Sequence, residues 1–128
     1  MSVVVVLADD LIWSTRLVAQ VRAAGSEAVA AREAGGFEAA LGGAGAAVVD
    51  LAVRSCDALA AIHSASEAGR PVLAVGDHDN LPLRKAALAA GADRVLAYRK
   101  LFEDGPATLA RWLARVLPDA EGPDDAGR

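Results

Sequence analysis

Residues 3–10 read VVVVLADD, an unbroken apolar and largely β-branched run that ends at two aspartates. A strand that is apolar on both faces is typical of a parallel sheet covered by helices on both sides. Residues 46–51 read AAVVDL, which is a second apolar run with an aspartate near its end. The two segments therefore predict buried strands of one parallel sheet.

Strand-like and helix-like segments alternate along the rest of the chain. Apolar residues recur at helical spacing after the predicted strands, and glycines follow several of the predicted helices. Each crossover is long enough for a helix, so the pattern predicts an α/β fold with parallel strands and helices on both faces. The predicted strands are residues 3–8, 27–31, 46–51, 71–75 and 94–98, and the predicted helices are residues 11–24, 36–41, 55–68, 81–90 and about 106–117.

The composition is that of one globular domain. The 128 residues are 54% hydrophobic and 23% charged, which excludes a disordered chain. A net charge of −4 argues against a nucleic-acid-binding surface, and the apolar runs are too short to span a membrane. We expect a cytoplasmic protein with one domain over residues 1–117 and a disordered polar tail over residues 118–128.

Three aspartates fall at one edge of the predicted sheet. Asp9 and Asp10 follow the first strand, and Asp50 lies at the end of the third. The carboxyl ends of parallel strands meet at the same edge, and neighbouring carboxylates repel one another unless a cation lies among them. A hard cation with oxygen ligands suits such a group, so Asp9, Asp10 and Asp50 predict a weak Mg²⁺ site.

Three motifs carry a resemblance to a known family. The sequences VLADD at residues 6–10, VVDL at 48–51 and GADR at 91–94 resemble the receiver domain of bacterial two-component response regulators. The resemblance implies a flavodoxin-like (CheY-like) three-layer sandwich whose five-stranded parallel sheet has the order 2-1-3-4-5. It also implies that Asp9 and Asp10 hold Mg²⁺ and that Asp50 accepts a phosphoryl group from a histidine kinase.

The chain departs from the family pattern at the positions that respond to the phosphoryl group. The family has a Ser or Thr at the end of the fourth strand, where this chain has Gly76. The family's Lys-Pro pair after the fifth strand aligns with Tyr98 and Arg99, and Lys100 follows. Val95 takes the place of the aromatic residue that rotates in the family. The resemblance therefore implies an atypical receiver, or pseudo-receiver, that keeps the acidic pocket and lacks the switch residues.

We expect a stand-alone signalling or interaction module without enzymatic turnover, acting through a protein partner such as a histidine kinase or an effector. Arg111 and Arg115 lie four apart on the last predicted helix and share a face. That basic patch suits an acidic partner or a homodimer formed through the fourth helix, fifth strand and fifth helix. An ordinary solvated face is the alternative.

Other interpretations of the same residues stay open. A small flavodoxin-like enzyme that binds a metal or ligand could use Asp9, Asp10, Asp50 and His78. A phosphorylation-independent assembly module could keep the fold and lack the chemistry. Asp9 and Asp10 could also serve only as a turn and a helix N-cap, a position that aspartate favours, and His78 could be a solvated loop residue.

Overall fold

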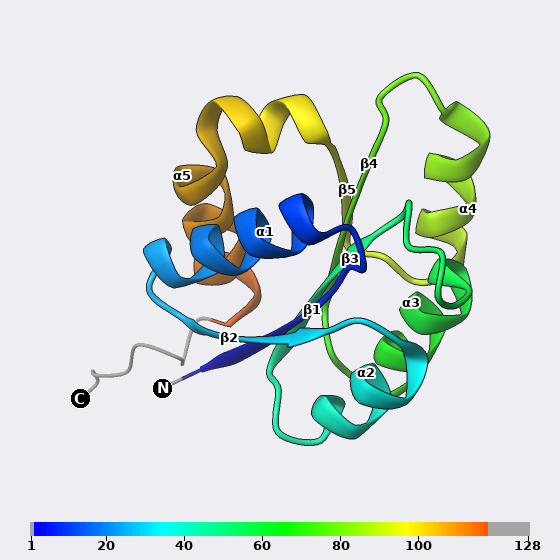
Figure 1. The fold of residues 1–128 in the computed structure, drawn as a ribbon, viewed down its shortest axis with the longest axis horizontal. Coiled ribbons are helices and arrows are strands. Elements are labelled where there is room, and N and C mark those ends of the chain that lie inside the picture. Colours follow the sequence, from blue (N-terminus) through cyan, green and yellow to red (C-terminus); the bar gives the residue numbers. More distant parts are fainter. Residues whose placement is uncertain (1, 118–128) are drawn as a thin grey trace.

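The computed structural model describes residues 2–117 and contains one parallel sheet in the predicted order (Figure 1). The sheet order is β2-β1-β3-β4-β5, so β2 and β5 are the edge strands. The predicted tail over residues 118–128 lies outside the described residues. The strands are β1 (Val3–Leu7), β2 (Glu27–Ala31), β3 (Ala46–Asp50), β4 (Val72–Gly76) and β5 (Arg94–Ala97).

Five helices cover the two faces of the sheet. Figure 1 shows α1 and α5 together on one face and α2, α3 and α4 on the other. This arrangement is the predicted three-layer α/β sandwich. The helices are α1 (Leu11–Ala23), α2 (Ala34–Leu41), α3 (Ala58–Glu67), α4 (Leu81–Ala90) and α5 (Tyr98–Val116). Within the described part of the chain, none of them is long and apolar enough to cross a membrane.

The core is built from the strand side chains in two layers. Val4 and Val6 of β1 pack in the layer that contains Leu17 of α1, whereas Val5 and Leu7 pack in the opposite layer. Successive side chains of a strand point to opposite faces, so an unbroken apolar run supplies both layers. The continuous β-branched sequence is thus explained by burial on both sides.

Helix α5 differs most from the sequence expectation. We predicted its start near Pro106, but the helix begins at Tyr98 and is interrupted at Asp104, whose backbone is non-helical. Gly105 follows the interruption, and a Cβ there would collide with the side chain of Gln20. The amide of Gln20 donates a hydrogen bond to the carbonyl of Leu101 at 2.9 Å, which fixes α1 against the first half of α5.

The other helix boundaries differ from the prediction by a few residues. Helix α3 starts at Ala58 rather than at residue 55, because the side chain of Asp57 caps it by accepting hydrogen bonds from the amides of Leu59 and Ala60. Helix α2 starts at Ala34 rather than at residue 36.

The strand register brings the predicted site residues to one edge. Asp50 at the end of β3 is paired with Val75 of β4, and Gly76 is paired with Ala97 of β5. Tyr98 follows Ala97 directly, so the start of α5 lies at the same edge as the end of β3. Asp9 and Asp10 lie between β1 and α1 at this edge.

Candidate functional site

A pocket of about 510 Å³ lies at the carboxyl edge of the sheet. The three predicted aspartates all line it, together with two aromatic side chains that the sequence analysis had not assigned to one site. Its lining residues are Asp9, Asp10, Trp13, Asp50, Ala52, Arg54 and Tyr98.

Asp50 is the deepest of the three carboxylates and is only 1% exposed. Its Oδ1 accepts hydrogen bonds from the hydroxyl of Tyr98 and from the amide of Ala52. Burial raises the pKa of Asp50, the two hydrogen bonds oppose this effect, and the charges of Asp10 and Asp9 add to it. The net effect is a pKa above the ordinary value, at a carboxyl group that already has two donors.

Tyr98 connects this carboxylate to α5 and α1. Its ring lies against Trp13 with the ring centroids 4.6 Å apart and the planes tilted by 37°. Burial and the neighbouring Asp50 raise the pKa of Tyr98, so the phenol stays protonated and acts as a neutral donor. The sequence placed Tyr98 at the family's lysine position, but nothing local in the sequence indicated its hydrogen bond to Asp50.

Asp9 holds the loop between β3 and α3. Its Oδ2 accepts hydrogen bonds from the amides of Arg54 at 2.8 Å and Ser55 at 2.7 Å. Burial acts to raise the pKa of Asp9, but these hydrogen bonds outweigh it and leave the pKa below its ordinary value. Asp9 is therefore ionised at neutral pH and ties two segments of the site together.

Asp10 is the N-cap of α1, as one of the alternatives held. Its Oδ1 accepts a hydrogen bond from the amide of Trp13 at 3.0 Å, which satisfies one of the free donors at the start of the helix. The capping role accounts for an aspartate at this position without any metal.

The carboxylate oxygens of Asp9, Asp10 and Asp50 suit a weakly held hard cation better than a preformed metal centre. The hydrogen bonds described above engage one oxygen of each of Asp9, Asp10 and Asp50, which leaves the other oxygens for a ligand. Among residues 2–117, however, no three His, Cys, Asp or Glu side chains are arranged to hold a metal ion. Carboxylate oxygens are the ligands that Mg²⁺ takes, so the chemistry fits and the arrangement would have to adjust.

The side chain of Leu51 occupies the space next to Gly76. A Cβ at Gly76 would lie 3.0 Å from Cδ1 and 3.3 Å from Cβ of Leu51. Leu51 is buried directly after Asp50, and its amide donates a hydrogen bond to the carbonyl of Val75 at 2.8 Å. A Ser or Thr at residue 76 would therefore need Leu51 to move.

Lys100 and His78 lie away from the acidic pocket. The ammonium of Lys100 is 3.8 Å from Asp104 within α5, and Arg99 pairs with Glu103. His78 is 2.8 Å from Asp79 in the loop before α4, and its side chain is 69% exposed. His78 does not line the pocket with the aspartates, which weakens the interpretation as an enzyme that combines them.

The basic patch predicted on the last helix is partly neutralised within the chain. The guanidinium of Arg115 pairs with Asp93, which also accepts a hydrogen bond from the indole of Trp112 at 2.8 Å. Arg111 lies near Asp104 and Thr108. Asp93 thus neutralises part of the charge of this patch within the chain itself.

No protein-family model matches the sequence, and no curated protein matches it either. Solved structures do match the fold. The receiver domain of NtrX from Brucella abortus has a TM-score of 0.77 at 18% identity, over 91% of this chain and 99% of that one. A response regulator protein from Burkholderia pseudomallei with a phosphorylated aspartic acid, a calcium ion and citrate has a TM-score of 0.68 at 15% identity, over 94% of this chain and 75% of that one.

A protein from Burkholderia thailandensis described as a pilus assembly protein (CpaE) also matches, with a TM-score of 0.71 at 19% identity, over 92% of this chain and 99% of that one. These likenesses, together with the sheet order, define the class of fold as flavodoxin-like α/β. Within that class the chain has the CheY-like receiver fold, which confirms the fold predicted from the sequence.

Proposed function

We propose that this chain is an atypical receiver-like signalling module of the two-component type, acting through a protein partner and without enzymatic turnover. The fold and the position of Asp50 at the end of β3 support the receiver assignment. The departures at Gly76 and Tyr98 support the atypical part of the proposal.

The hydrogen bond between Tyr98 and Asp50 carries the proposal. In the family that the sequence resembles, a lysine at this position supplies a positive charge to the phosphoryl group. Tyr98 reaches the same aspartate but supplies only a neutral hydroxyl. A phosphoryl group adds a charge of about −2, so its attachment to Asp50 beside Asp9 and Asp10 would lack that compensation. Phosphorylation of Asp50 is therefore weak and produces little structural response.

Gly76 removes the second group that would respond. A hydroxyl at the end of β4 is the family's other link from the phosphoryl group to the output surface. Leu51 fills the corresponding space here, so the end of β4 has no hydroxyl that could be drawn toward Asp50.

Mg²⁺ is the cation we propose for the acidic pocket, held weakly by Asp9, Asp10 and Asp50. When bound, it would offset the repulsion among the three carboxylates. The role of the protein is to keep those carboxylates at one edge, with Asp9 fixed by the β3–α3 loop and Asp10 fixed by its capping bond.

The partner is a histidine kinase or an effector, and we propose the surface of α4, β5 and α5 for it and for homodimer formation. An exposed apolar side chain supports this surface, since Leu88 of α4 is 52% exposed. A phosphorylation-independent assembly module is the second candidate. It is favoured by the same missing switch residues and by the likeness to the CpaE structure.

Labelling with a small phosphodonor tests the proposal. The parent, Asp50→Asn and Tyr98→Lys would be incubated with acetyl phosphate and Mg²⁺, and the mass of the intact protein would be followed with time. We expect little labelling of the parent, none of Asp50→Asn and more of Tyr98→Lys. Rapid and nearly complete labelling of the parent at Asp50 would contradict the proposal.

A further inference from the structure

A second pocket, separate from the acidic one, lies between β5 and α5. It has a volume of about 340 Å³, and four of its lining residues are cationic, on a protein whose net charge is −4. Because β5 is an edge strand, this pocket opens beside a strand that has a neighbour on one side only. Its lining residues are Leu73, Arg94, Leu96, Lys100, Thr108, Arg111, Trp112 and Arg115.

The pocket is a recess with an apolar floor and a cationic rim. Leu73 is fully buried and Trp112 is 3% exposed, so both lie beneath the surface. Leu96 is half-buried, and the Thr108 side chain is buried with its hydroxyl near Arg111. A ligand that fits this shape would have a compact carbon body below and an anionic group above.

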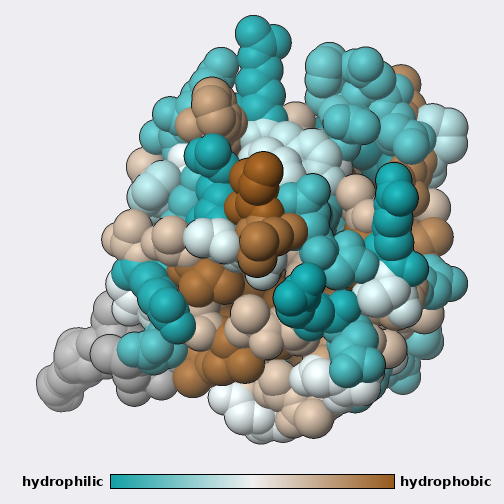
Figure 2. Space-filling model, in the orientation of Figure 1, coloured by the Kyte–Doolittle hydropathy of each residue, from teal (hydrophilic) through white to brown (hydrophobic). Residues whose placement is uncertain are grey.

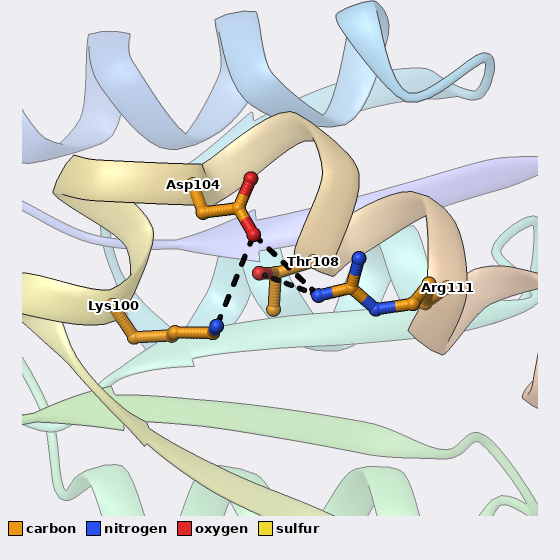
Figure 3. A network of polar contacts seen from close by, with 4 residues as sticks. All are labelled: Lys100, Asp104, Thr108 and Arg111. Atoms are coloured by element: carbon orange, nitrogen blue, oxygen red, sulfur yellow. Dashed lines mark hydrogen bonds and ion pairs between the residues drawn. The ribbon is translucent and has the colours of Figure 1, made fainter.

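Two of the cations are held only loosely by the chain itself. Figure 3 shows Lys100 and Arg111 approaching Asp104 from opposite sides, with Thr108 between them. The distances to Oδ2 of Asp104 are 3.8 Å from Lys100 and 3.6 Å from Arg111, which are too long for hydrogen bonds. The interruption of α5 at Asp104 places this carboxylate between the two cations.

The remaining two cations leave the pocket with a positive surplus. Arg115 is paired with Asp93, whereas Arg94 has no ion pair among residues 2–117. Four cationic side chains thus face two carboxylates, those of Asp93 and Asp104. A phosphate monoester carries a charge of about −1.5 to −2 at neutral pH, which matches this surplus.

We propose that this pocket binds a small organic phosphate, with its phosphoryl group held by Arg94, Lys100 and Arg111. The planar guanidinium groups can bind phosphoryl oxygens through paired hydrogen bonds, and Lys100 adds a point charge. Leu96 and the edge of Trp112 receive the carbon body of the ligand. Asp104 acts as an internal competitor for the same cations.

The recess favours a small ligand over an acidic protein segment. A protein segment would lie across the rim, and its binding would not depend on the buried floor. A small phosphate ester would enter the recess and change the surroundings of the Trp112 indole, whose Nε1–H donates to Asp93. The indole resonance is therefore a local reporter that separates the two cases.

Titrations of the full chain with AMP, adenosine and inorganic pyrophosphate test the proposal, followed by calorimetry and by the Trp112 Nε1–H resonance. AMP should bind saturably and shift that resonance, whereas adenosine should not bind. Pyrophosphate should compete with AMP.

Arg111→Gln should weaken AMP binding about tenfold or more, since it removes a charge-assisted contact. Asp104→Asn should strengthen it, because asparagine is close to aspartate in shape and lacks the competing charge.

Arg32→Gln is the matched control, since Arg32 is an exposed arginine outside the pocket, and its AMP affinity should equal that of the parent. The absence of saturable AMP binding at up to about ten millimolar would overturn the proposal, as would equal affinities of Arg111→Gln and Arg32→Gln. Sedimentation of the same variants measures whether the pocket instead mediates association between copies of the chain. If Arg111→Gln changes the mass of the assembly and AMP does not bind, the pocket is part of an interface between copies and the proposal is wrong.

Discussion

The hydroxyl of Tyr98 donates a hydrogen bond to the buried carboxylate of Asp50, joining the start of α5 to the end of β3. The two residues are 48 positions apart in the sequence. The bond closes the acidic pocket on the side of α5 with a neutral donor, and Trp13 supports the ring from α1.

Tyr98→Phe should destabilise the protein by about 1–3 kcal/mol at pH 7, because it removes a donor from a buried carboxylate. Urea unfolding of the parent and the variant measures the change. The loss should be smaller when the substitution is made in Asp50→Asn, since the partner is then uncharged. Equal losses in both backgrounds would show that Tyr98 acts through its ring packing and not through Asp50.

Mg²⁺ should stabilise the parent by mass action. At ten times its dissociation constant, the ion adds about 1.4 kcal/mol to the free energy of unfolding, which raises the melting temperature by a few degrees. Asp10→Asn should abolish most of this rise while keeping the helix cap.

Asp57→Asn is the matched control for the metal experiment, because Asp57 caps α3 in the same way and lies outside the pocket. It should keep the full Mg²⁺-dependent rise in melting temperature. A rise of the same size in Asp10→Asn, or no rise in the parent, would contradict the proposed metal site.

The contacts of Asp93 predict a pH dependence of stability. Burial opposes ionisation, but the hydrogen bonds from Arg115 and Trp112 outweigh it and lower the pKa of Asp93 in the folded state. The carboxylate therefore stabilises the fold above the ordinary pKa of 3.8, and this contribution disappears as the pH falls through the lower folded value. Unfolding of the parent and Asp93→Asn should differ most near pH 7 and converge in acid. A constant difference from pH 7 to pH 2 would contradict the assignment.

Gly76→Ala should destabilise the protein by about 1–3 kcal/mol, since the new methyl group would press on Leu51. In the Leu51→Ala background, Gly76→Ala should cost less, because the Cδ1 atom that would lie 3.0 Å from the new methyl group is gone. Gly35→Ala is the control, as a Cβ there meets nothing within 4 Å and alanine favours the helix. If Gly76→Ala is harmless in the parent, Leu51 does not explain the glycine.

Much of the fold could be predicted because its strands are buried on both faces and therefore read as continuous apolar runs. The edge at which Asp9, Asp10 and Asp50 meet followed from the parallel topology, and all three line one pocket. The first half of α5 could not be predicted, because Asp104, Gly105 and Pro106 interrupt its periodicity.

The residues that contact each site residue could also not be predicted from the sequence. Two of these contacts depend on how α1, α5 and β3 pack together. They are the close approach of Gly105 to Gln20 and the hydrogen bond from Tyr98 to Asp50. The spacing of residues within one segment of the sequence does not predict such long-range contacts. The capping role of Asp10 was visible as an alternative because it involves only the next three residues.

We propose that Asp50 occupies a receiver-like pocket that lacks the hydroxyl and the lysine through which a phosphoryl group would act on β4 and β5. Two-dimensional NMR of the labelled full chain, before and after addition of Mg²⁺ and beryllofluoride, tests it most directly. We predict changes confined to the surroundings of Asp9, Asp50 and Tyr98, including the adjoining ends of β4 and β5, with α4 and the rest of both strands unchanged. Shifts that extend through β4 and β5 to the α4 surface would contradict the account.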